Sequence, residues 1–147
     1  MKCLDTGVLV YAADASSPHH RRAVEFLEQS ISGKWAACIC EQSLREFATL
    51  MADPRFVRRP LSPAAVGRMI EKLMRYPQPV VLYPDDAILR RAIRLTERHA
   101  GRLSFPAAYV ASTMLAHGVK VLVTADRNAF SALREIEIEN PFETLFA

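Results

Sequence analysis

Two aspartates stand beside apolar runs and could work together at one end of a sheet. Asp5 is the only charged residue between Lys2 and Asp14, and it interrupts the run CLDTGVLVYA. Asp126 directly follows the run VKVLVTA. If both runs contain strands of one parallel sheet, the two carboxylates lie outside the carboxyl ends of the strands, where such sheets bind their ligands.

A pair of carboxylates at one place predicts a cation or a shifted pKa. Two unit charges 4 Å apart repel by about 4 kcal/mol at an effective dielectric constant near 20. Carboxylate oxygens are hard ligands and favour Mg²⁺ or Mn²⁺, which keeps several waters and can meet a substrate phosphate. Thr6 and Thr124 stand beside the two acids and strengthen this interpretation. The alternative is that each aspartate only forms the turn after its strand.

The elements that must position these acids alternate along the chain. Continuous apolar runs predict strands covered on both faces, at about 3–12, 35–40, 80–83 and 119–125. Helical patterns lie between them, at about 19–31, 41–53, 63–75, 85–99 and 105–117. This alternation predicts an α/β fold, a three-layer α/β/α sandwich with a mainly parallel sheet, in a single domain over residues 1–147.

Composition agrees with a globular protein of the cytoplasm. Half of the 147 residues are hydrophobic and 24% are charged, and no apolar run is long enough to cross a membrane. We expect no export signal, because Asp5 interrupts the apolar stretch near the start. Three cysteines without framework spacing indicate a reducing compartment. Cys38 and Cys40 would share one face of a strand as buried small side chains.

Several segments together resemble the PIN domains, particularly the VapC-type toxin nucleases of bacteria. The segments are LDTGVLVYA, EQSLREFATLMADPR, RRPLSP, VLYPDDAILRRAIRL and RLSFPAAYVASTMLAHGVKVLVTADRNAF, and they follow the family in order and spacing. The resemblance implies a metal-dependent endoribonuclease, the toxin of a type II toxin–antitoxin pair. It also implies an RNA substrate, Mg²⁺ or Mn²⁺ as cofactor, a small antitoxin protein as partner and a homodimer.

The resemblance assigns roles to particular acids. Asp5, Glu46 and Asp126 take the catalytic places, and Asp5 and Asp126 are the metal ligands. Without the resemblance, Glu46 is an ordinary solvated residue, because it lies nearly opposite the apolar stripe of its helix. Glu41 is the nearby alternative to Glu46.

Supporting roles fall to three polar residues that flank the acids. They are Thr6, Thr124 and Asn128. Asn128 stands where the family commonly has a second aspartate, and an amide can accept a hydrogen bond but has no charge.

Two positions depart from the family pattern. The acid expected at the start of the helix at 105–117 is Ala107, which makes position 107 a degenerate ligand position. Gly7 replaces the usual Asn or Ser, which reduces hydrogen-bonding support for a metal ligand. Three carboxylates form three repelling pairs where four would form six, so the attraction for a cation falls. We therefore expect impaired nuclease activity.

Two other function classes remain. The same fold could be catalytically inactive and bind RNA or an antitoxin. Ala107 is the residue that separates this alternative from an active nuclease. A phosphoacceptor signalling domain also gathers acids at strand ends. It needs a lysine after the last strand, however, and no lysine follows Lys120.

Overall fold

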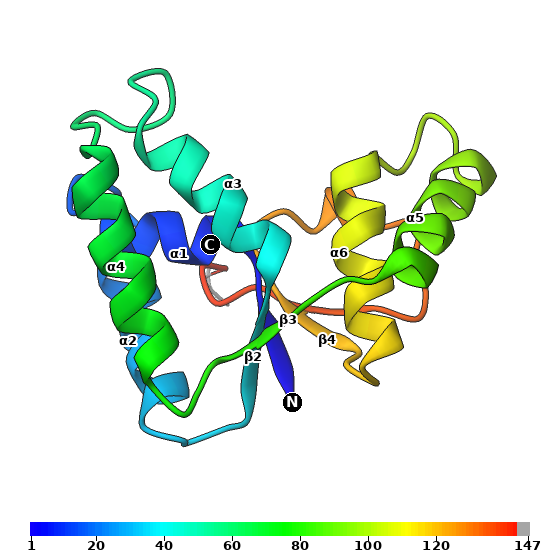
Figure 1. Ribbon diagram of the computed structural model, residues 1–147, viewed down its shortest axis with the longest axis horizontal. Helices are drawn as coiled ribbons and strands as arrows, with labels where there is room; N and C mark the ends of the chain where they lie inside the picture. The colour runs from blue at the N-terminus through cyan, green and yellow to red at the C-terminus, as the bar shows by residue number, and fades with distance from the viewer. Residues whose placement is uncertain (144–147) are drawn as a thin grey trace.

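A parallel sheet of five strands forms the centre of the protein, in the order β3-β2-β1-β4-β5. The computed structural model describes residues 1–143 (Figure 1). The strands are β1 (Lys2–Leu4), β2 (Ala37–Cys40), β3 (Val80–Leu82), β4 (Val121–Val123) and β5 (Glu137–Glu139). Leu4 pairs with Val123, so the neighbouring strands β1 and β4 end side by side.

Helices cover both faces of this sheet and make the predicted three-layer sandwich. They are α1 (Thr6–Ala13), α2 (His20–Ile31), α3 (Glu41–Met51), α4 (Pro63–Arg75), α5 (Asp86–Arg98) and α6 (Phe105–Ala116), with a short 3-10 helix η1 (Asn128–Phe130). Figure 1 shows α1 to α4 on one side of the sheet and α5 and α6 on the other. The predicted α/β fold with a mainly parallel sheet is therefore confirmed.

Successive side chains along the strands pack alternately into two separate hydrophobic cores. Cys3 packs into the core beneath α5 and α6, whereas the next residue, Leu4, packs into the core beneath α1 to α4. On β2, Cys38 and Cys40 lie in the first of these cores and Ile39 lies in the second. The two cysteines therefore share one face, as predicted, and both are buried free thiols.

The first apolar run differs from its prediction. A strand was expected across residues 3–12, but the strand ends at Leu4 and Thr6–Ala13 is the helix α1. The Thr6 backbone N–H donates to Asp5 Oδ1 at 2.9 Å, so Asp5 caps the start of this helix. Because α1 packs between other helices and is apolar on most sides, its sequence has no helical period to distinguish it from a buried strand.

The other predicted elements agree with the structure to within two residues at each end. Side chains cap the starts of two of these helices, and a glycine follows the end of one. Ser104 Oγ accepts from the Ala107 N–H at 3.3 Å, and Asp85 Oδ1 accepts from the Ile88 N–H at 2.9 Å. Gly118 follows α6 with φ 72°, a backbone angle that favours glycine.

One strand was not predicted. β5 pairs in parallel with β4, with Ile138 opposite Leu122, and forms one edge of the sheet. Within residues 1–143, no helix is both long and apolar enough to cross a membrane.

Candidate active site

The carboxyl ends of β1 and β4 bring Asp5 and Asp126 to the same end of the sheet. The Asp5 N–H donates to the carbonyl of Val123 at 3.0 Å, which continues the pairing of the two strands by one residue. Thr124 follows Val123, and its hydroxyl donates to Asp5 Oδ2 at 2.7 Å. The same hydroxyl oxygen accepts from the Asp126 N–H at 3.1 Å. Thr124 thus links the two acids.

A second threonine links Asp5 to α3. The Thr6 N–H donates to Asp5 Oδ1, and the Thr6 hydroxyl donates to Glu46 Oε2 at 3.0 Å. Thr6 and Thr124 are only 4% and 2% exposed. Because buried side chains have few alternative positions, the two threonines hold the carboxylates of Asp5 and Glu46 in place.

The site carries negative charge that few contacts balance. Burial raises the pKa of Asp5, hydrogen bonds from Thr124 and Thr6 partly oppose this rise, and the charges of Glu46 and Asp126 raise the pKa further. Within residues 1–143, no lysine, arginine or histidine forms an ion pair with these three acids.

Asp126 and Asn128 lie on the exposed side of the site. Asp126 Oδ1 accepts from the Ala129 N–H at 3.1 Å, which fixes the carboxylate at the start of η1. Asn128 is the first residue of η1 and is exposed. The structure therefore brings Asp5, Glu46 and Asp126 into one hydrogen-bonded group with the two threonines, while Asn128 stands two residues beyond it.

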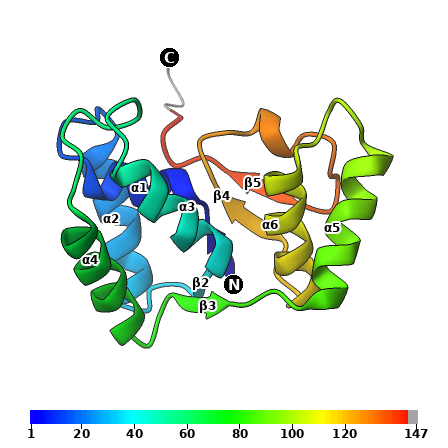
Figure 2. The same cartoon turned by 45° about the horizontal axis from the view of Figure 1, so that its top comes forward.

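Ala107 lies in the first turn of α6 and is 7% exposed. Its neighbours Pro106 and Val110 line a cleft of about 460 Å³ between α6 and α3, and Glu46 lines the same cleft from α3. Figure 2 shows these two helices facing each other. The position where an acid was expected is thus on the helix that faces Glu46, but its side chain is a methyl group.

Other side chains of this cleft were missed by sequence reasoning. Gln42, Arg45 and Thr49 line it from α3, and Phe105 and Tyr109 line it from α6. The available signal was the spacing of Phe105 and Tyr109, which stand four residues apart and therefore on one face of a helix.

The donor chemistry of the acids fits a hard divalent ion. Asp5 and Asp126 supply carboxylate oxygens, and their negative charge lacks a balancing ion pair within the described chain. Across residues 1–143, no three Asp, Glu, His or Cys side chains are grouped so that they could hold a metal ion. An ion at this site would therefore bind at most two of the carboxylates directly, with water as the other ligands.

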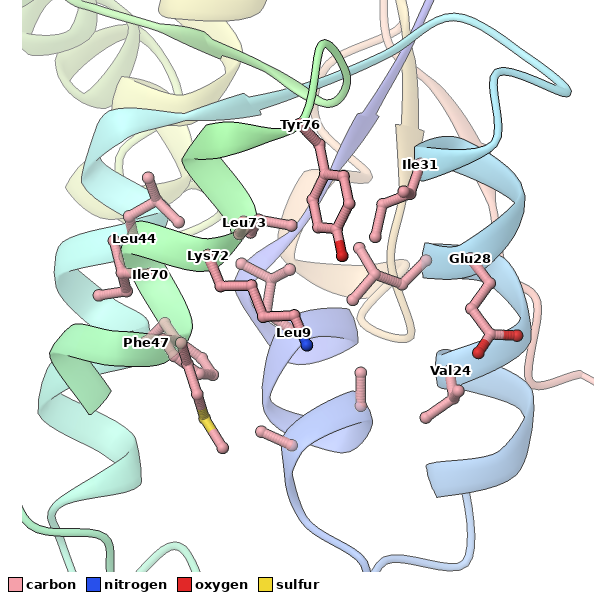
Figure 3. Close-up of a pocket in the computed structure, with 14 residues that line it drawn as sticks. Leu9, Val24, Glu28, Ile31, Leu44, Phe47, Ile70, Lys72, Leu73 and Tyr76 are labelled. Atoms are coloured by element: carbon pink, nitrogen blue, oxygen red, sulfur yellow. The ribbon is translucent and has the colours of Figure 1, made fainter. Parts of the chain in front are cut away.

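A separate groove opens on the side of the molecule that carries α1, α2, α3 and α4. It has a volume of about 370 Å³ and is mainly apolar, with Leu9, Leu27, Phe47, Ile70 and Leu73 among its lining residues. Figure 3 shows the charged ends of Glu28 and Lys72 and the hydroxyl of Tyr76 among these apolar side chains. The three acids do not line this groove.

Sequence comparison identifies a family. The family model described as PIN domain matches residues 2–136. Ribonuclease VapC24 of Mycobacterium tuberculosis is 29% identical over 134 residues, which cover 89% of this chain and 90% of the relative.

Solved structures show the same fold at low sequence identity. VapC20 of M. tuberculosis, described as a Sarcin-Ricin loop cleaving toxin, has a TM-score of 0.69 and 18% identity, with 93% of this chain and 99% of that chain covered. A toxin-antitoxin complex from Klebsiella pneumoniae has a TM-score of 0.66 and 18% identity, with coverage of 98% and 100%. VapBC-1 from nontypeable Haemophilus influenzae has a TM-score of 0.67 and 14% identity, with coverage of 97% and 98%.

Proposed function

The chain belongs to the PIN domain family, and from this membership we propose that it is a metal-dependent endoribonuclease, the toxin of a type II toxin–antitoxin pair. The observation that carries the proposal is the hydrogen-bonded group in which Thr124 links Asp5 to Asp126 and Thr6 links Asp5 to Glu46. Acids held together in this way, without balancing cations, have the chemistry of a metal and phosphate site.

Asp5 and Asp126 would hold one Mg²⁺ or Mn²⁺ ion. When bound, such an ion lowers the pKa of a water molecule and stabilises negative charge on a phosphate. Thr124 orients the Asp5 carboxylate, and Thr6 orients Glu46 at the wall of the cleft. Glu46 is exposed, so it can accept a hydrogen bond from the water that attacks the RNA phosphodiester.

The departures from the family pattern weaken this activity in our proposal. Ala107 offers no ligand, so the site supports one ion better than two, and Gly7 and Asn128 add no charge. The alternative is a catalytically inactive protein of the same fold that binds RNA or an antitoxin. Ala107 is the residue that favours this alternative.

Incubation with structured and single-stranded RNA would test the proposal. We expect slow cleavage with Mg²⁺ or Mn²⁺, no cleavage with EDTA, and loss of cleavage in Asp126→Asn. Asp85→Asn is a matched control, because Asp85 caps α5 and does not belong to the group of acids. If neither this chain nor Ala107→Asp cleaves RNA while both remain folded, the inactive alternative holds.

The partner in this proposal is an antitoxin protein. One of the structurally similar proteins above is described as a toxin-antitoxin complex, which supports the proposal. The apolar groove lined by Leu9, Ile70 and Leu73 would receive an apolar segment of the antitoxin, and Glu28 and Lys72 would offer it charged contacts. A candidate antitoxin should copurify with this chain and be lost from Leu73→Asp, whereas Lys120→Asp, outside the groove, should retain it.

We also propose a homodimer that works in the cytoplasm. The family resemblance supports the dimer, and the buried free thiols of Cys3, Cys38 and Cys40 support a reducing environment. Light scattering of the purified chain at several concentrations would test the dimer. A mass of 16.5 kDa at every concentration would contradict it.

A further inference from the structure

The cleft between α3 and α6 carries an aromatic pair close to Glu46. Phe105 is the first residue of α6, and its side chain is 38% exposed although it is a large apolar group. Its ring lies 5.5 Å from the ring of Tyr109, between centroids, with 34° between the ring planes. Both residues line the cleft, so one of its walls presents aromatic surface.

Hydrogen bonds fix the distance between the two walls of this cleft. The side-chain amide of Gln42 on α3 donates to the Tyr109 carbonyl at 3.1 Å and to Thr113 Oγ1 at 2.8 Å. The Thr113 hydroxyl in turn donates to the Tyr109 carbonyl at 2.9 Å. The cleft is therefore held in shape and does not depend on a ligand to form it.

An exposed cation lies on the α3 wall. Arg45 pairs with Glu41 one helical turn earlier at 2.9 Å, and its side chain is 64% exposed. Exposed pairs of this kind contribute little to stability, so the guanidinium can turn from Glu41 to a phosphate at low cost. The cleft thus combines aromatic surface, a cation and, at Glu46, contact with the group of acids.

We propose that this cleft binds one unpaired nucleobase of a single-stranded RNA, next to the phosphate that would be cleaved at the group of acids. The base stacks on Phe105 and Tyr109, and Arg45 contacts a flanking phosphate. The volume of about 460 Å³ lies within the range of small-ligand sites. Base-paired RNA is excluded, because its bases are stacked within the duplex and offer no free face. This inference rests on the proposed ribonuclease function and adds the substrate class and a specificity element to it.

Binding of RNA in EDTA tests the subsite without requiring cleavage. Fluorescence anisotropy at low salt would compare a single-stranded RNA oligonucleotide, the same oligonucleotide with one abasic position, and its duplex. We expect Phe105→Leu to weaken binding of the single strand by about 5- to 100-fold, as base–aromatic stacking requires, and Phe105→Trp to preserve it. The abasic oligonucleotide should bind this chain more weakly, but Phe105→Leu should not discriminate against it.

Each outcome separates the subsite from the nuclease proposal. Equal binding of the single strand by this chain and Phe105→Leu overturns the subsite, as does equal or tighter binding of the duplex, or no binding of the single strand. Loss of antitoxin binding but not RNA binding in Phe105→Leu would make the cleft a protein site and also overturns the inference. Base-dependent binding in a chain that cleaves nothing keeps the subsite and removes the enzyme. Circular dichroism of each variant confirms folding.

Discussion

The hydroxyl of Thr124 donates to Oδ2 of Asp5 over 2.7 Å, although 119 positions of the chain separate the two residues. The same oxygen accepts from the Asp126 N–H at 3.1 Å. One buried threonine therefore connects the ends of β1 and β4: it orients the Asp5 carboxylate and holds the backbone of Asp126.

We predict that Thr124→Val lowers metal affinity and any metal-dependent cleavage by about 10- to 100-fold, the usual effect of losing a partner that orients a ligand. Valine keeps the shape of threonine but removes the donor to Asp5 Oδ2 and the acceptor of the Asp126 N–H, while the Thr6 N–H still donates to Asp5 Oδ1. Thr124→Ser keeps the hydroxyl and should retain most of the affinity. Mn²⁺ titration by calorimetry measures the difference, and equal affinities of the two variants would contradict the role of Thr124.

Replacement of Asp5 by asparagine should change how stability depends on pH in metal-free buffer. The pKa of Asp5 in the folded chain is raised above its ordinary value of 3.8, first by burial. Between the unfolded and folded pKa values the folded protein binds more protons, so this residue makes the free energy of unfolding fall as pH rises through that window.

Asp5→Asn removes this contribution. We expect the stability of Asp5→Asn relative to the unchanged chain to increase as pH rises from about 3 to 8 in denaturant titrations with EDTA. Asp85→Asn serves as a comparison, because Asp85 lies at the start of α5, away from the group of acids. Parallel pH profiles for Asp5→Asn and the unchanged chain would rule out the effect.

An acid at position 107 should strengthen the site. Ala107 is in the first turn of α6, where free N–H groups favour negative charge, so aspartate suits the helix. We expect Ala107→Asp to raise metal-dependent RNA cleavage by at least about tenfold, equivalent to about 1.4 kcal/mol of transition-state stabilisation. Ala107→Asn is of similar size but uncharged and should not raise it. Equal rates in the two variants would mean that the charge is irrelevant.

Gly7 offers a test of stability that does not depend on function. A methyl group at Gly7 in α1 would meet no atom within 4 Å, and the backbone there is helical. We expect Gly7→Ala to raise the free energy of unfolding by about 0.5 to 1 kcal/mol, because alanine favours helices more than glycine does. Gly118→Ala is the opposing control, since φ 72° at Gly118 is unfavourable for alanine. Urea titration measures both, and destabilisation by Gly7→Ala would contradict the expectation.

The sequence was sufficient to predict helices whose apolar residues recur with the helical period. The amphipathic helices α2 to α5 and the topology that places Asp5 near Asp126 could both be predicted. α1 could not, because its sequence continues the apolar run of β1 without a polar face, and neither could β5, because Glu137 and Glu139 make its three residues resemble a loop. Glu46 lies opposite the apolar stripe of its helix, as a solvated residue does. Its connection to Asp5 is visible only in the long-range hydrogen bond from Thr6.

The two edge strands of the sheet, β3 and β5, affect whether the concentrated protein aggregates. A terminal strand exposes unpaired backbone groups that can recruit another chain and start fibrous aggregation. At β5 the exposed Glu137 puts charge on that margin, whereas Glu139 pairs with Lys2 of β1 at 2.8 Å. At β3 Pro79 and Pro84 restrict the strand to three residues. Both margins thus discourage uncontrolled strand-to-strand growth, which leaves association to the helical surfaces.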